Sequence, residues 1–146
     1  MIEFRAITPE NYQECIKLTV AESQKTFVAS NQRSLADAYV YRDTVHTYSL
    51  YANEEMVGFL MMIPDPKEHE TMWIWRLMID QRYQHQGYGK EAMKKAISDT
   101  RSIGRFNQIK LDFVPTNLDA KALYESHGFI PTGEIEDGEV VMVLKL

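Results

Sequence analysis

Apolar and polar positions follow regular spacings along most of this chain. Alternating or continuous apolar residues predict strands over residues 2–8, 47–52, 56–63, 71–79 and 108–114. Helical spacing predicts helices from Pro9 to about Val20 and over residues 34–39, 87–103 and 118–127, and residues 129–146 form two more strands. This order gives one strand-helix-strand unit in a largely antiparallel setting, which indicates a mixed α/β (α+β) fold.

Local signals set the expected boundaries of these elements. Proline at the first helical position favours a helix start at Pro9, and Gly128 suits a left-handed residue that ends the last helix. Asn53 and the pair Asp137-Gly138 suit tight hairpin turns. The helix over 87–103 should bury one stripe, formed by Ala92, Met93, Ala96, Ile97 and Ile103. Residues 24–33 show no clear period.

Composition narrows the class of protein. A length of 146 residues with 45% hydrophobic and 25% charged residues suits a single domain spanning residues 1–146. There is no apolar stretch long enough for a membrane span, and the start Met1–Arg5 lacks signal-peptide features, so we expect a cytoplasmic protein without a membrane partner. The net charge of -5 argues against a nucleic-acid partner. Cys15, the only cysteine, has helical spacing that predicts a core position.

The segment Gln84-His85-Gln86-Gly87-Tyr88-Gly89-Lys90 lies between an apolar run and an amphipathic run. A strand that leads through a glycine-bearing loop directly into a helix gathers free backbone N–H groups at the positive end of the helix dipole. Such a loop binds anions, and diphosphate-bearing cofactors are its usual ligands. We call residues 84–90 the anion loop.

Several anion-binding motifs resemble this loop. Residues 87–92 satisfy the permissive dinucleotide pattern G-x-G-x-x-A, with Asp112 as the later acidic residue. In that fold, however, the glycines follow the strand almost at once, whereas residues 80–86 intervene here, and the chain ends in a hairpin. No G-x-x-x-x-G-K-[ST] motif occurs, so a P-loop is excluded. A tight turn containing two glycines is the remaining structural alternative.

The pattern Gln84-x-x-Gly87-x-Gly89 resembles the acyl-CoA signature of the GNAT superfamily of N-acetyltransferases. The later pattern Asn117-x-x-Ala120-x-x-Leu123-Tyr124-x-x-x-Gly128-Phe129 is similar to a helix of the same superfamily. This resemblance implies a mixed, mostly antiparallel sheet of six to seven strands, flanked by about four helices and splayed between strands four and five. It also implies acetyl-CoA as cosubstrate, with no metal.

The resemblance further implies which residues bind the cosubstrate. Backbone N–H groups from His85 to Lys90 would hold the pyrophosphate, and strand four would present its backbone beside a bulge. Asn117 would bond the pantetheine or cap its helix. The implied cofactor-binding residues are Leu77, Met78, Ile79, Gln84, His85, Gln86, Gly87, Tyr88, Gly89, Lys90, Asn117 and Tyr124.

The implied reaction is direct transfer of acetyl to a primary amine, without a covalent enzyme intermediate. The amide near Met78 would stabilise the oxyanion, and Tyr124 would act as general acid. A protonated amine needs a base, for which Glu70 is the first choice. Further candidates are Asp112, Glu22 and His46, and ordered water is an alternative.

Within the superfamily, two stretches resemble bacterial spermine/spermidine (diamine) N-acetyltransferases: residues 27–36 and Trp75-Arg76-Leu77-Met78-Ile79-Asp80. A small-molecule amine such as spermidine is then the expected partner, with Glu22, Glu70 and Trp75 as substrate-site candidates. Other candidates for polyamine binding are the acids Glu54, Glu55 and Glu68, while Trp73 and Trp75 pack in the core or line the acceptor cleft.

Two other functions stay open. The acceptor can be an aminoglycoside, an amino acid or a protein N-terminus, or the chain can be a non-catalytic CoA-binding module, against which the intact Tyr124 argues. The apolar run Val140–Leu144 suits either the core or a homodimer interface.

Overall fold

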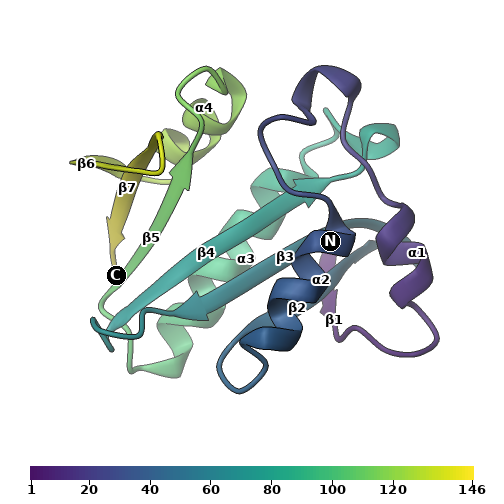
Figure 1. Ribbon diagram of the computed structural model, residues 1–146, viewed down its shortest axis with the longest axis horizontal. Helices are drawn as coiled ribbons and strands as arrows, with labels where there is room; N and C mark the ends of the chain where they lie inside the picture. Colours follow the sequence, from purple (N-terminus) through teal and green to yellow (C-terminus); the bar gives the residue numbers. More distant parts are fainter.

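Seven strands form one sheet in the order β1-β2-β3-β4-β5-β7-β6 in the computed structural model, which describes residues 1–146 (Figure 1). All neighbouring strands are antiparallel except β4 and β5. The strands are β1 (Ile2–Arg5), β2 (His46–Ala52), β3 (Glu55–Pro64), β4 (Thr71–Ile79), β5 (Gln108–Phe113), β6 (Ile130–Glu136) and β7 (Glu139–Lys145). The helices are α1 (Tyr12–Lys17), α2 (Asn31–Val40), α3 (Tyr88–Ile103) and α4 (Leu118–Ser126), with short 3-10 turns η1 (Glu22–Gln24) and η2 (Gln81–Tyr83). The predicted fold class is confirmed.

The parallel pair β4 and β5 is joined at one end only. Pairing runs from Thr71 opposite Gln108 to Trp73 opposite Lys110 and then stops. Beyond Trp73 the strands diverge, as Figure 1 shows at their arrow ends: β4 continues along β3 and β5 along β7. A register shift between Met61 and Met62 leaves Trp75 of β4 without a partner on β3. The predicted splay is therefore present, with its bulge at Trp75, two residues before Leu77.

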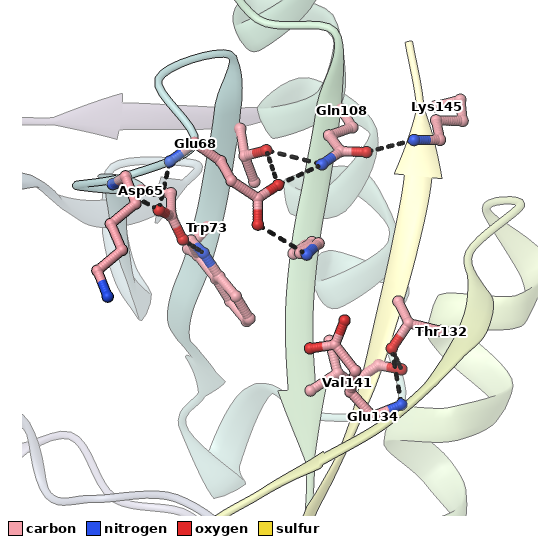
Figure 2. A network of polar contacts seen from close by, with 11 residues as sticks. Asp65, Glu68, Trp73, Gln108, Thr132, Glu134, Val141 and Lys145 are labelled. Atoms are coloured by element: carbon pink, nitrogen blue, oxygen red, sulfur yellow. Dashed lines mark hydrogen bonds and ion pairs between the residues drawn. The ribbon is translucent and has the colours of Figure 1, made fainter.

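A polar network fixes the joined end of this pair (Figure 2). Gln108 donates to the Thr71 hydroxyl (2.7 Å) and to Glu68 (3.3 Å), while Lys145 of β7 bonds the Gln108 carbonyl. The Trp73 indole donates to Asp65 at 2.8 Å. Because Thr71 and Gln108 are buried and fully paired, the two strands are held together here and separate only toward their other ends.

Helices cover the two faces of the sheet with separate apolar clusters. The larger cluster lies under α3, whose buried residues are Ala92, Met93, Ala96, Ile97 and Thr100. The prediction that Ile103 belongs to this buried stripe is wrong, since its side chain is 56% exposed. The helix ends at this point because the next residue, Gly104, is left-handed. The smaller cluster, on the side of α1 and α2, contains fully buried Cys15, as predicted.

The N-terminal elements are shorter than predicted. α1 begins at Tyr12 because Asn11 folds residues 8–11 into a turn, accepting from the Thr8 N–H (2.8 Å) and donating to Ala6. It ends at Lys17, after which extended Leu18 leads the chain toward β4. The first strand likewise ends at Arg5 and not at residue 8.

Other boundaries agree with the predictions or extend them. α2 begins at Asn31, before the predicted start, because the Ser30 hydroxyl caps it by accepting from the Arg33 N–H. Asn53 and Asp137 adopt positive φ in their hairpin turns, and Gly128 does so after α4. The run 140–144 contributes buried Val141 and Met142 to the core, and β6 forms the sheet edge. No helix combines the length and apolar character that a membrane crossing needs.

Candidate active site

The anion loop presents a row of free backbone donors. None of the six N–H groups from His85 to Lys90 donates a hydrogen bond to another group of the chain. His85 (φ 63°) and Gly87 (φ 85°) adopt left-handed conformations, and α3 begins directly afterwards at Tyr88. The free N–H groups and the positive end of a 16-residue helix therefore meet at one place, as an anion-binding loop requires.

Two side chains hold this loop in position. Asp80, only 2% exposed, accepts from the Arg82 guanidinium (2.8 Å) and from the backbone N–H groups of Arg82 and Thr19. Burial opposes ionisation of Asp80, but these hydrogen bonds outweigh it and lower the carboxyl pKa. Gln84 donates from one amide nitrogen to the Ile79 carbonyl (3.0 Å) and to Gln24 of η1 (2.9 Å). Gln84 thus braces the loop through its side chain.

A pocket of about 410 Å³ opens between the end of β4, the anion loop and α4. Its volume lies in the range of small-molecule sites. Eleven of the twelve residues predicted to bind the cofactor line it, and Gln86 is the exception. The lining residues that were not predicted to bind the cofactor are Val20, Gln24, Phe27, Val28, Tyr83, Asp119, Ala120 and Leu123. Four of these come from η1 and its flanking segments, outside the anion loop and α4.

The backbone of β4 offers donors to this pocket at alternate residues. Met78 is paired with Phe59, and the Asp80 N–H donates to Val57 at 2.8 Å. Because N–H groups alternate along a strand, the Met78 N–H points toward β3, while those of Leu77 and Ile79 point to the side that β5 has left. Of the amides near Met78, where the sequence predicts the oxyanion donor, those of Leu77 and Ile79 face the opening.

Tyr124 extends from α4 into the pocket. Its half-buried ring contacts Phe113 and Phe129 at centroid distances of 6.0 and 6.1 Å, and its hydroxyl makes no hydrogen bond within the chain. Burial, with smaller effects of Asp112 and Glu139, raises the pKa of Tyr124 to about 12. The phenol is therefore protonated at neutral pH and has a free proton to donate.

Asn117 both caps a helix and lines the pocket. Its side-chain oxygen accepts from the Ala120 N–H at 3.2 Å, which stabilises the first turn of α4. The two roles predicted for Asn117 are thus compatible, because its amide nitrogen makes no hydrogen bond within the chain.

The residues predicted as base and substrate contacts do not line the pocket. Glu70 precedes β4 and bonds Asn107, roughly 30 Å along the strand from Ile79, so its prediction as base is corrected. Glu22 is exposed and pairs with Lys25 at 2.7 Å. Trp75 packs edge-on against Tyr41. His46 opens β2, two strands away from β4.

Asp112 is the remaining base candidate; it does not line the pocket either, but it lies on the splayed half of the sheet. Buried Leu111 and Phe113 face α3, so Asp112, between them on β5, faces the opposite side. Burial, together with Glu139 and Glu136, raises the pKa of Asp112 to about 6, against a smaller opposing effect of Arg76. Asp112 has no ion-pair partner within 4 Å.

Arg76 lies at the bulge of β4 and is engaged elsewhere. Its guanidinium donates to the Ser34 hydroxyl (3.0 Å) and to Asp37 of α2 (3.1 Å), and it is 15% exposed. Arg33 shares Asp37 from one turn away. The carboxylate of Asp37 is thus neutralised by two arginines, while those of Asp112 and Glu139 are not.

Comparisons with known proteins agree on one family. Residues 12–129 match the Acetyltransferase (GNAT) family. A spermine/spermidine N(1)-acetyltransferase of Bacillus subtilis is 32% identical over 99% of both chains. Among solved structures, a spermidine N-acetyltransferase from Vibrio cholerae in complex with CoA and spermine has a TM-score of 0.78 at 16% identity, covering 99% of this chain and 95% of that chain. An aminoglycoside acetyltransferase in complex with coenzyme A and kanamycin has a TM-score of 0.83 at 16% identity, with the same coverage.

Proposed function

Because this chain belongs to the Acetyltransferase (GNAT) family, we propose that it transfers acetyl from acetyl-CoA to a primary amine of a polyamine such as spermidine or spermine. One observation carries the proposal: five residues with unpaired backbone donors and the unpaired Tyr124 hydroxyl meet at a single pocket of about 410 Å³. The donors suit a diphosphate, and a protonated phenol suits a leaving thiolate.

The chain's own groups supply binding and orientation of the cosubstrate. The N–H groups of residues 85–90 would hold the pyrophosphate of acetyl-CoA, which brings an activated thioester to the pocket. Gly89 has no side chain in the space beside Ile79 and Leu123, where a Cβ would lie 3.8 Å from each of these side chains. This space stays open for the cosubstrate. The backbone of β4 beyond the bulge would align the pantetheine arm, because β5 no longer pairs with it.

Two groups stabilise the reaction as charge develops. The Leu77 or Ile79 N–H would donate to the carbonyl oxygen, which becomes negative when the amine attacks. Tyr124 would donate its hydroxyl proton to the departing sulfur. Its high pKa keeps the phenol protonated at neutral pH, so the proton is present when the sulfur leaves.

Two further features favour a polyamine acceptor. The B. subtilis relative matched over the full chain is named for spermine and spermidine. Unpaired carboxylates at Asp112 and Glu139 also suit a substrate that carries several ammonium groups. An aminoglycoside is a second polycationic candidate. The acetyltransferase bound to kanamycin is about as similar in fold to this chain as the spermidine N-acetyltransferase is.

An acceptor panel tests the proposal. Purified protein and acetyl-CoA are mixed with spermidine, spermine, putrescine, lysine or kanamycin, and free thiol is measured over time. We expect kcat/KM for spermidine or spermine to exceed that for lysine at least tenfold. A preference for kanamycin or lysine would overturn the polyamine assignment. Coenzyme A binding by calorimetry with no turnover on any amine would favour the non-catalytic module.

A homodimer stays part of this proposal. The edge strand β6 exposes Ile130 (60%) and Ile135 (63%), which two copies of the chain could cover.

A further inference from the structure

Asp112 and Glu139 are neighbours on one face of the sheet. Asp112 of β5 lies directly opposite Val141 of β7, and Glu139 is two residues from Val141, so both carboxylates point to the same side. That side is opposite the one packed on α3, because Leu111, Phe113 and Met142 belong to the α3 cluster. Burial raises the pKa of Glu139 as well. The splayed half of the sheet thus has two unneutralised carboxylates beside each other.

The splay places Asp112 across from the bulge of β4. Extending the register of Trp73 opposite Lys110 by two residues sets Asp112 level with Trp75, where the bulge begins. The strands no longer pair at this level, so the opening lies between Asp112 and the bulge of β4, two residues before Leu77. Tyr124 approaches from α4, close enough for Asp112 and Glu139 to affect its titration. Asp112 and Tyr124 thus lie on the two sides of the opening, since the Tyr124 ring packs with Phe113 and Phe129 on the α3 side and Asp112 faces the other side.

Every charged group around Asp112 can be named. Glu139 of β7 and Glu136 of β6 disfavour its ionised form, Arg76 of β4 favours it, and Tyr124 of α4 is neutral. On its own strand, Lys110 is engaged with Glu68 at 3.5 Å and with the Trp73 ring. Arg76, the cation that acts on Asp112, is likewise engaged elsewhere, because it bonds Asp37 and Ser34. Asp112 and Glu139 therefore lack a cationic partner within the chain, and a bound cation would neutralise them.

We propose that Asp112, supported by Glu139, binds the ammonium group of the acceptor and takes its proton, so that Asp112 is a catalytic residue and Glu139 a specificity-determining one. This inference rests on the proposed function, because it needs an amine acceptor.

The proton balance closes with the residues present. The acceptor ammonium gives one proton to the Asp112 carboxylate, and the neutral amine forms the new N–C bond. When the C–S bond breaks, the sulfur takes the Tyr124 proton and leaves as the thiol. The second proton of the attacking nitrogen restores the Tyr124 hydroxyl, and Asp112 releases its proton to solvent.

The environment of Asp112 suits this role. An alkylammonium has a pKa of about 10, so an ordinary carboxylate is a weak base toward it. Raising the carboxyl pKa from 3.8 to about 6 makes Asp112 about a hundredfold stronger as a base while it is still mostly ionised at neutral pH.

The test compares pH profiles of kcat/KM with the best acceptor of the panel. We expect Asp112→Asn to lower kcat/KM about 10²-fold or more. The fall of kcat/KM at pH values below about 6, the acidic limb of the profile, should also be absent. Asp112→Glu should recover part of the activity. Glu139→Gln should raise KM for the polyamine several-fold and move the limb to lower pH, because one like charge is removed. Glu134→Gln on β6 is the matched control, since Glu134 is exposed and does not act on Asp112.

Coenzyme A affinity and circular dichroism of each variant separate a local effect from misfolding. An Asp112→Asn profile with the wild-type limb and rate would overturn the inference and leave the proposed function standing. A wild-type enzyme that acetylates lysine but no polyamine would instead overturn the polyamine assignment, and Asp112→Asn is then assayed with lysine. Full activity of Asp112→Asn in that assay also overturns the inference.

Discussion

Tyr124 combines burial with an unpaired hydroxyl, which a merely structural tyrosine would not need. We expect Tyr124→Phe to lower kcat about a hundredfold with little change in coenzyme A affinity, because only the proton donor is removed while the ring contacts with Phe113 and Phe129 persist. Steady-state thiol release and calorimetry measure the two quantities. Tyr39→Phe, at a position 69% exposed, is the control. A Tyr124→Phe enzyme as fast as wild type would contradict the role of general acid.

Gly89 provides a test in which stability and binding move in opposite directions. A Cβ at this position would meet only ordinary contacts in the free protein, 3.8 Å from Ile79 and Leu123, and alanine favours the helix over glycine. Gly89→Ala should therefore keep or raise the free energy of unfolding by up to about 1 kcal/mol. The methyl group would occupy the space beside the free N–H groups, so coenzyme A affinity should fall at least tenfold.

Denaturant unfolding and calorimetry check this pair of effects. Unchanged coenzyme A affinity in a stable Gly89→Ala protein would show that the ligand does not approach the first turn of α3. Gly104→Ala serves as a contrast: its φ of 78° predicts lost stability with unchanged affinity per folded molecule.

At the scale of elements, Arg76 joins α2 to the bulge of β4. Arg76→Met should raise the pKa of Asp112 and Glu139, since Arg76 lowers both, and so move the acidic limb of kcat/KM to higher pH. Breaking its part-buried bonds to Ser34 and Asp37 should also cost about 1–3 kcal/mol of stability.

Arg33→Met is the matched control for this variant. Arg33 pairs with the same Asp37 at 3.1 Å but is 69% exposed and does not act on Asp112. We expect a wild-type pH profile from Arg33→Met and a stability loss below 1 kcal/mol. Equal shifts of the acidic limb in both variants would mean that α2 as a whole, and not the Arg76 charge, sets the titration.

The elements also show what the sequence could and could not predict. The end of β4, the anion loop and the α4 motif are contiguous stretches that resemble those of the family, so eleven pocket residues were predictable from the resemblance. Gln24, Phe27 and Val28 were not, because they reach the pocket through a tertiary contact between Gln24 and Gln84. Glu70 was misassigned since it shares a strand with the site but lies at its joined end. The pairing of Asp112 with Glu139 depends on strand order, which no local pattern specifies.

At the scale of the whole molecule, carboxylates affect stability in opposite directions. Asp37, Asp65 and Asp80 are each partly desolvated, yet their hydrogen bonds lower the pKa below 3.8. These carboxylates stabilise the fold at pH values above the pKa that they have in the unfolded chain. This contribution is lost as pH falls through the lower pKa of the folded state. Asp112, whose folded pKa is raised, stabilises the fold fully only below its unfolded pKa of 3.8, and that contribution is lost as pH rises through about 6.

The charged form of Asp112 is therefore a cost to the folded protein at neutral pH. Asp112→Asn removes this cost, and with allowance for the screening of a partly exposed group we expect a gain of about 1–2 kcal/mol at pH 7.5, or about 2–6 °C in Tm. At pH 4 most of the gain should vanish, because wild-type Asp112 is then protonated in the fold. Thermal unfolding at both pH values measures this difference, with Glu134→Gln as control. A variant that is less stable at pH 7.5 would identify the Asp112 carboxylate as a structural acceptor, whereas a variant that gains stability while losing turnover places its charge there for the reaction.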